Sequence, residues 1–479
     1  MPNFTCKLSD PATPLTHSWE HTVGSGHAPL ALRADWQAQL RRCHQELGFR
    51  HVRFHALLSD QMGTLICQND KLLYSFFNAD RIMDFLLSIG MRPFVELSFM
   101  PETLASGKKT VFHYQANVTP PKDYKQWATL IKKLVSHWVE RYGLAEVSQW
   151  FFEVWNEPNL EAFGTGKQND YFQLYRSTVE AIKSVDGSLK VGGPATAQNA
   201  WVPEFLEYCE KHKLAADFVS THYYPTDAFG KIGADTAAQL AHAPPDIMQK
   251  RARETCANAQ GLPIYYTEWN ISSNPRDPFH DEPFAAALAT NIIMGVQGLV
   301  QGYSYWTFSD IFEENYFPSV PFHGGFGLLN IYGIAKPIYR AFELLHRLGD
   351  EVLPIHGKHK TVSAWVTRQA AEVTVLLTNH AMPEHAIKTE LVSLQLKDSN
   401  RPLTAYLERV DKHHANPLAL WRAMKNPEYL SPREVEQLQA ASCLTQQPHP
   451  LQYEKRSVQL EVSLPPHSIA ALTIEFAPA

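Results

Sequence analysis

Two glutamates in this sequence follow short apolar stretches and are flanked by aromatic residues. Glu157 lies in FFEVWNEPNL (151–160), after a run typical of a buried strand and directly before Pro158. Glu268 lies in PIYYTEWN (263–270), a stretch of the same character. Glycoside hydrolysis needs such a pair, because one carboxyl protonates the departing oxygen while the other stabilises or attacks the anomeric carbon. The two glutamates are therefore the candidate catalytic residues.

A structural interpretation of each glutamate competes with the catalytic one. Either carboxylate alone could be an ion-pair partner at a strand end, and the Asn-Glu-Pro tripeptide is short enough to occur by chance. The aromatic flanks would exclude water and raise the pKa of Glu157, as a general acid working near neutral pH requires. Pro158 would help to fix the chain after Glu157. The joint occurrence of both glutamates favours the catalytic interpretation.

The elements that must position this pair alternate between short strands and amphipathic helices. Strands are predicted near 17–24 and at 51–58, 92–101, 151–155, 189–195, 217–225, 263–270 and 303–310, each followed by a helical stretch. No Gly-rich dinucleotide fingerprint follows the first strand, which argues against a doubly wound sheet. We predict an α/β fold, a (β/α)₈ TIM barrel over residues 15–348, in which active sites lie at the carboxyl ends of the strands.

The chain after residue 348 is rich in β-strand patterns. It contains TVSAWVTRQ, AEVTVLLTNHA and TELVSLQL, with one helical insertion around LALWRAMKNPEYLSPREVEQLQAA. We predict an accessory β-sandwich domain over residues 349–479, which the N-terminal segment 1–14 could join.

Most predicted barrel strands end in polar or aromatic residues. Besides the two glutamates, the strand ends offer Arg53, His55, Glu96, Asn156, His222, Tyr223, Tyr224, Trp306, Asp310, Glu313 and Glu314.

Composition excludes several other classes of function. The net charge of −6 argues against nucleic-acid binding, and no apolar run approaches the eighteen residues or so of a membrane span. Among 22 histidines there is no His-Glu-x-x-His, so no metal site is predicted, and no P-loop or Gly-x-Ser-x-Gly motif is present. The six cysteines are far apart and no signal peptide is recognised, so we expect reduced, mostly buried thiols and a cytoplasmic location.

The chain resembles glycoside hydrolase family 39, the family of bacterial β-xylosidases and animal α-L-iduronidases. The resemblance covers residues 20–345 and rests on GFRHVRFHALLSD, RPFVELSFMPETLASG, NVTPPKDY, FFEVWNEPNL, VGGPAT, YYTEWN, SYWTFSDIFEE and FHGGFGLL. The later stretch LWRAMKNPEYLSPREVEQL resembles the accessory β-domain of the bacterial β-xylosidases. Phe54 and Ala56 depart from the family pattern, in which glycine commonly flanks the histidine between them.

The resemblance implies roles for the residues at the strand ends. Glu157 would be the acid/base and Glu268 the nucleophile of a retaining mechanism, with Arg53 and Tyr224 orienting Glu268. Whether Tyr223 or Tyr224 faces the pocket depends on the register of that strand. Asn156 would bond the sugar 2-hydroxyl. The other implied contacts to the sugar are hydroxyl contacts from His55, His222, Glu313 and Glu314 and stacking by Trp306 and Phe163.

The sequence therefore predicts a retaining exo-β-1,4-xylosidase that releases xylose from short xylo-oligosaccharides, without a cofactor or metal. Two alternatives stay open: the same machinery acting on an α-L-arabinopyranoside, β-glucoside or α-L-iduronide, and a non-catalytic sugar-binding protein. The acidic Glu313–Glu314 loop disfavours a uronide. Oligomeric state, a homo-oligomer included, is left open, and no nucleic-acid or membrane partner is predicted.

Overall fold

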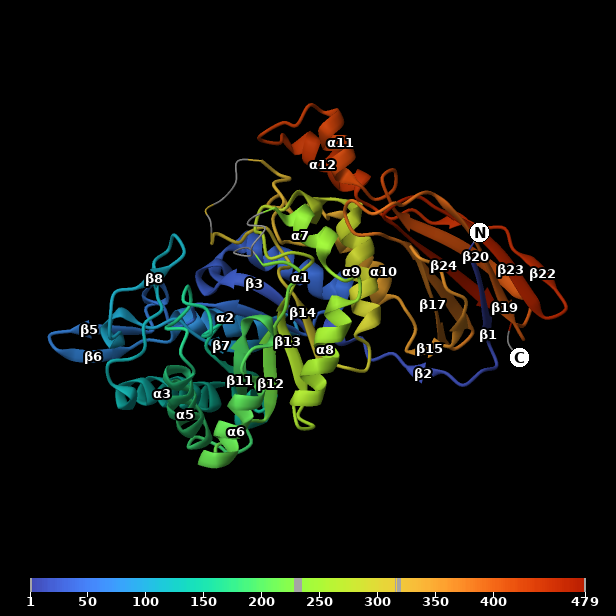
Figure 1. Ribbon diagram of the computed structural model, residues 1–479. Helices are drawn as coiled ribbons and strands as arrows, with labels where there is room; N and C mark the ends of the chain where they lie inside the picture. Colours follow the sequence, from blue (N-terminus) through green and yellow to red (C-terminus); the bar gives the residue numbers. More distant parts are fainter. Residues whose placement is uncertain (1, 228–234, 315, 317–319, 478–479) are drawn as a thin grey trace.

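The computed structural model describes residues 2–227, 235–314, 316 and 320–477. Within these residues, parallel strands close into a barrel in the order β3-β4-β7-β10-β11-β12-β13-β14. Figure 1 shows the barrel with its helices beside a second β-rich region, and α11 and α12 on one side of both. The structure confirms the predicted (β/α)₈ barrel with an accessory β-sandwich.

The barrel strands are short, and polar residues follow several of their carboxyl ends. Their bounds are β3 Thr22–His27, β4 His51–His55, β7 Arg92–Leu97, β10 Phe151–Val154, β11 Lys190–Thr196, β12 Phe218–His222, β13 Ile264–Trp269 and β14 Gly302–Tyr305.

The helices of the barrel bury their apolar faces against it. They are α1 Ala34–Leu47, α2 Phe77–Ser88, α3 Tyr124–Tyr142, α4 Leu144–Val147, α5 Gln168–Lys183, α6 Val202–His212, α7 Thr236–His242, α8 Ile247–Asn258, α9 Pro283–Gly295 and α10 Pro337–His346. Helix α2 shows why local sequence predicts such elements. Its Ile82, Phe85 and Leu86 are buried at helical spacing. Gly90, at φ 83, allows the N–H of Met91 to bond Leu86 O at 3.0 Å, as the predicted C-cap requires.

The first barrel strand begins later than predicted. Ser18–Glu20 forms a 3₁₀ turn instead of a strand, with His17 Nδ1 2.6 Å from Glu20 Oε1. Trp19 is fully buried, so its apolar character comes from packing in this turn and not from strand alternation. The strand itself occupies Thr22–His27.

Two sheets form the accessory region. One has the order β16-β1-β19-β23-β22, with β16 Ile355–His356, β1 Asn3–Lys7, β19 Glu390–Lys397, β23 Ser457–Leu464 and β22 Gln452–Glu454. The other has the order β2-β15-β17-β18-β24-β20-β21, with β2 Thr13–Pro14, β15 Glu351–Leu353, β17 Val362–Gln369, β18 Glu372–Asn379, β24 Ser468–Phe476, β20 Pro402–Val410 and β21 Gln447–Pro448. The strand nearest the N-terminus thus lies among strands from the end of the chain.

Several contacts join the accessory region to the barrel. Helix α9 packs against β18 and β24, and α10 packs against β20. The helical insertion forms α11 Pro417–Ala423 and α12 Pro432–Ala441. Trp421 and Leu438 of this insertion pack with Phe322 and Ile334 from the segment that follows β14. The insertion therefore supports a segment on the barrel's carboxyl-terminal side.

Two hairpins extend the barrel loops, β5 Leu65–Gln68 with β6 Lys71–Tyr74 and β8 Thr110–Val111 with β9 Ala116–Asn117. None of the helices in the described part of the chain is long and apolar enough to cross a membrane. All six cysteines are free thiols. Three are exposed, namely Cys67, Cys256 and Cys443, so the expectation of mostly buried thiols is met by only half of them.

Candidate active site

The turn after β10 carries Glu157 into the barrel. Trp155 and Glu157 have φ values of 70° and 41°, in a region that bulky residues rarely adopt. The N–H of Glu157 donates to Ala195 O of β11 at 2.8 Å, which helps to hold this conformation. Unusual backbone of this kind is typical of functional sites, because it fixes the direction of a side chain.

Glu157 and Glu268 meet beside His222. One carboxylate oxygen of each glutamate and one ring nitrogen of His222 all lie within 4.8 Å of one another. His222 Nδ1 lies 3.0 Å from Glu157 Oε1 and 3.6 Å from Glu268 Oε2. The structure therefore brings the two predicted carboxylates together, although they are more than one hundred residues apart in the sequence.

Arg53 binds the carboxylates around it and is fully buried. Its Nη1 donates to Glu268 Oε1 at 2.8 Å and its Nε to Glu153 Oε2 at 2.5 Å. Its Nη2 lies 2.8 Å from Glu96 Oε2 and donates to Asn156 Oδ1 at 2.9 Å. A planar guanidinium suits this multiple recognition, since its N–H donors have a fixed geometry. Arg53 thereby orients Glu268 and Asn156 at the same time.

Tyr224 is the second group that orients Glu268. Its hydroxyl donates to Glu268 Oε2 at 3.0 Å, whereas Tyr223 accepts from Arg251 Nε at 3.3 Å, away from the pair. The register left open by the sequence is therefore the one that turns Tyr224 inward. Glu268 accepts one hydrogen bond on each oxygen, which fixes the orientation of its carboxylate plane.

The protonation of Glu157 is set by its surroundings. Burial raises its pKa well above the ordinary glutamate value, and the nearby charge of Glu268 raises it further. Burial, together with the positive charge of Arg53, holds the pKa of His222 well below that of an ordinary histidine. Glu157 is thus a carboxylic acid facing a neutral imidazole, which is the state of a general acid before reaction.

The same geometry bears on metal binding. Glu157, His222 and Glu268 are the one group of potential ligands in the described residues that is compact enough to hold an ion. The guanidinium of Arg53, 2.8 Å from Glu268, already supplies the positive charge that a cation would bring. The donor atoms are also committed to hydrogen bonds with Arg53, Tyr224 and each other. These residues therefore fit an acid–nucleophile pair better than a metal centre.

His55, Trp306 and Glu314 form a wall beside Glu268. His55 Nδ1 lies 2.6 Å from Glu96 Oε2, and its Nε2 lies 3.7 Å from Glu268 and 3.5 Å from Glu314. The ring of Trp306 lies 4.8 Å from that of His55. Burial and the charge of Glu268 raise the pKa of Glu314 well above the ordinary value. This wall combines polar groups and an aromatic face, as sugar recognition requires.

Three predicted contact residues are engaged with other protein groups. Both ring nitrogens of His222 are bonded to protein groups, Nδ1 to Glu157 and Nε2 to Thr267 Oγ1 at 3.1 Å, so neither is left free for a sugar hydroxyl. Glu313 turns away from the pair and binds Arg33 and His27, each at 3.1 Å.

Phe163 is the third of these residues. It is partly exposed and packs with Phe99 and Phe112, with ring centroids 6.4 and 5.5 Å away. Its ring therefore lies in an aromatic group next to His55, whose ring is 5.9 Å from that of Phe99.

Sequence reasoning missed the residues behind the pair. Glu153 is fully buried in the middle of β10 and accepts from Thr267 Oγ1 at 2.7 Å. A signal was present, because a glutamate inside the apolar run FFEV cannot be buried without a partner. The partner, Arg53, lies one hundred residues away in the sequence, so only the closed barrel reveals it.

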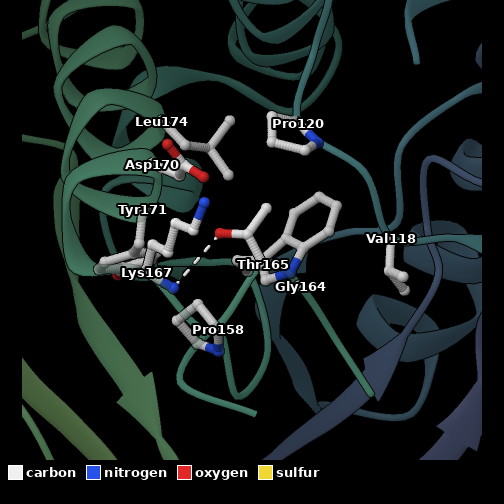
Figure 2. A pocket seen from close by; sticks show the side chains of 10 residues that line it. Val118, Pro120, Pro158, Gly164, Thr165, Lys167, Asp170, Tyr171 and Leu174 are labelled. Atoms are coloured by element: carbon white, nitrogen blue, oxygen red, sulfur yellow. Dashed lines mark hydrogen bonds between the residues drawn. The ribbon is translucent and has the colours of Figure 1, made fainter. Parts of the chain in front are cut away.

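A small pocket lies behind the turn that carries Glu157. Figure 2 shows it between Pro158, Pro120 and the start of α5, with Lys167 N bonded to Thr165 Oγ1 at 3.3 Å. Its volume of about 30 Å³ is enough for a water molecule or two but not for a sugar ring. The pocket therefore adjoins the candidate site without being part of it.

Known proteins that are similar to this chain are glycoside hydrolases, in agreement with the paired carboxyls of the site. The model of the family described as glycosyl hydrolases family 39 matches residues 5–454. A β-xylosidase of Caldicellulosiruptor saccharolyticus is 46% identical over 95% of each chain, and one of Geobacillus stearothermophilus is 37% identical over 96% of this chain and 92% of that protein. The crystal structure of a GH39 enzyme from Xanthomonas axonopodis pv. citri superposes with a TM-score of 0.87 at 34% identity, covering 99% of this chain and 98% of that one.

Proposed function

This chain belongs to glycosyl hydrolases family 39, and from that premise we propose that it is a retaining exo-β-xylosidase. The substrates would be short xylo-oligosaccharides, from whose non-reducing ends it releases xylose. The observation that carries the proposal is the Glu157–Glu268 pair, with carboxylate oxygens within 4.8 Å of each other. Retaining enzymes hold their carboxyls about 5–5.5 Å apart, whereas inverting enzymes need roughly 6.5–9.5 Å to admit a water molecule.

In the first step Glu268 attacks the anomeric carbon as the bond to the departing oxygen breaks. Glu157, protonated for the reasons given above, delivers its proton to that oxygen. Arg53 and Tyr224 hold the attacking carboxylate in place without touching the acid. The products of this step are the free aglycone and a xylosyl ester on Glu268.

In the second step a water molecule enters the space that the aglycone has left. Glu157, now a carboxylate, takes a proton from the water. The oxygen of the water attacks the anomeric carbon, and the ester bond to Glu268 breaks. Two displacements on opposite faces return the original configuration, so the first product is β-xylose. Glu157 is then protonated again and Glu268 is free, so the cycle is closed.

The choice of xylose is supported by the two β-xylosidases compared above, which match this chain over nearly its whole length. Exo action is supported by the β8–β9 hairpin, whose Phe112 and Tyr114 stack on His55 and His27 and so border the site.

The decisive experiment is hydrolysis of 4-nitrophenyl β-D-xylopyranoside, followed by proton NMR of the released sugar. Early appearance of β-xylose is expected and would support both the glycone and retention. Early α-xylose would mean inversion and would overturn the role of Glu268 as nucleophile. Cleavage of the arabinopyranoside or glucoside with a higher kcat/KM would overturn the glycone, and absence of all turnover would favour a sugar-binding protein.

A further inference from the structure

A buried line of hydrogen bonds runs from Glu157 to the back of the barrel. Glu157 Oε1 lies 3.0 Å from His222 Nδ1, and His222 Nε2 lies 3.1 Å from Thr267 Oγ1. Thr267 Oγ1 in turn donates to Glu153 Oε1 at 2.7 Å, and Glu153 Oε2 accepts from Arg53 Nε at 2.5 Å. All five residues are nine-tenths buried or more, so water does not compete for these bonds.

The direction of each bond follows from the number of hydrogens available. Thr267 has a single hydroxyl hydrogen, and it is given to Glu153. The oxygen of Thr267 can then only accept from His222, which must carry its hydrogen on Nε2. Burial raises the pKa of Glu153 and the charge of Arg53 opposes this; because Arg53 Nε and the Thr267 hydroxyl each donate to one of its oxygens, the carboxylate is the form that satisfies both donors.

We propose that Thr267 and Glu153 are positioning residues that fix His222 as the Nε2–H tautomer and thereby make its Nδ1 an acceptor for the proton of Glu157. The inference rests on the proposed function, in which Glu157 is the general acid. Loss of that proton would leave the Nδ1 lone pair facing a carboxylate, so this line of hydrogen bonds favours the protonated form of Glu157. The same arrangement makes the Glu157 carboxylate more ready to take a proton from water in the second step.

The line of hydrogen bonds acts by orienting His222, and no proton needs to travel along it. In the first step the proton of Glu157 goes to the departing oxygen, and in the second step water returns one. His222 stays neutral throughout, as its burial beside Arg53 favours. The charged and titratable groups that face Glu157 and His222 from the surrounding strands and loops are Arg53, His55, Glu96, Glu153, Tyr224, Glu268 and Glu314.

The direct test is nitrogen-15 NMR of the wild-type protein with labelled histidine. The signal of His222 is identified by its loss in His222→Gln. We expect a hydrogen on Nε2 and none on Nδ1. A hydrogen on Nδ1 would overturn the proposal. This readout needs no turnover, so it separates failure of the inference from failure of the proposed xylosidase activity.

The functional test is the pH profile of kcat/KM on phenyl β-D-xyloside in Thr267→Val. The valine keeps the shape of threonine but frees His222 to donate from Nδ1 to ionised Glu157. The alkaline limb should therefore move to lower pH by about one unit, the scale of one buried hydrogen bond. Thr267→Ser, which keeps the hydroxyl, should retain the wild-type position of the limb.

A matched control is Thr290→Val. Thr290 is a fully buried threonine in α9 whose hydroxyl donates to Ala286 O at 2.9 Å, away from the site. The alkaline limb of the pH profile of Thr290→Val should stay at the wild-type pH. An unmoved limb in Thr267→Val, or an equal movement in Thr290→Val, would overturn the proposal. If Thr267→Val does not fold, the NMR measurement on the wild type decides.

Discussion

Gly24 is the residue on which the position of Trp306 depends. It lies on β3 beside Arg53 in the barrel register. A Cβ atom at this position would be 2.4 Å from Cε3 of Trp306 and 3.1 Å from Tyr305 O. Atoms in contact normally stay about 3.5–4 Å apart, so Gly24→Ala cannot be accommodated unless the indole moves by about 1 Å or more.

The consequence for activity follows from what surrounds the indole. Trp306 lies 4.8 Å from His55 and over Arg53 at 6.0 Å, so a displacement of the indole away from β3 disturbs the wall beside Glu268. A misplacement of about 1 Å in a positioning group can lower kcat/KM on the order of one hundredfold. Overpacking of a buried position also costs about 1–3 kcal/mol of folding free energy. We therefore expect Gly24→Ala to lose both activity and stability.

The assay compares kcat/KM on 4-nitrophenyl β-D-xylopyranoside and urea denaturation followed by tryptophan fluorescence. The control is Gly187→Ala, because a Cβ there meets no atom within 4 Å and its backbone needs no positive φ. Wild-type kcat/KM and stability in Gly24→Ala would refute the reasoning, since they would mean that the indole can move without affecting the site.

Three further predictions concern the acid, the nucleophile's partner and a buried cation. Glu157→Ala should lower kcat/KM on phenyl β-xyloside about 10²–10⁴-fold but much less on the 2,4-dinitrophenyl substrate, which needs no acid; equal losses measured on both would contradict its role. Because the pKa of Glu157 is raised, wild-type activity should fall with rising pH only above the ordinary range of a glutamate, and this limb should be absent from the profile of the variant. Tyr224→Phe removes one hydrogen bond from Glu268 and should cost about 1 kcal/mol in the barrier, roughly fivefold in kcat/KM, whereas Tyr223→Phe should not. Lys336→Met leaves two buried carboxylates without the amine that lies 2.8 Å from each, so urea denaturation should show a loss of about 3–5 kcal/mol; a loss below 1 kcal/mol would contradict this.

Much of the barrel could be predicted because its signals are local. Strand and helix alternate in the sequence, and the apolar spacing of α2 or the strand-end glutamates of β10 and β13 can be read within ten residues. The 3₁₀ turn at Ser18–Glu20 could not, since Trp19 is apolar for reasons of packing that a short window does not contain.

The candidate site also has features that local sequence predicts and features that it does not. Residue types at strand ends indicated the carboxylate pair, but the partners of each side chain depend on the closure of the barrel. The family resemblance implies a sugar-hydroxyl contact for His222, but only the closed barrel shows that its ring nitrogens bond Glu157 and Thr267. Glu313 and Glu314 are adjacent in sequence, yet one binds Arg33 and the other faces His55. Sequence alone does not distinguish two neighbours of the same type.

The distribution of charge in the barrel explains why two identical side chains take opposite roles. Arg53 and Tyr224 both donate to Glu268, whereas the polar neighbour of Glu157 is a neutral imidazole. Two charged or polar donors fix the orientation of the Glu268 carboxylate, which suits a nucleophile. Burial and the nearby charge of Glu268 raise the pKa of Glu157 despite the opposing charge of Arg53, which suits an acid. The guanidinium of Arg53 binds Glu268 and not Glu157, and this difference in partners distinguishes the two carboxyls.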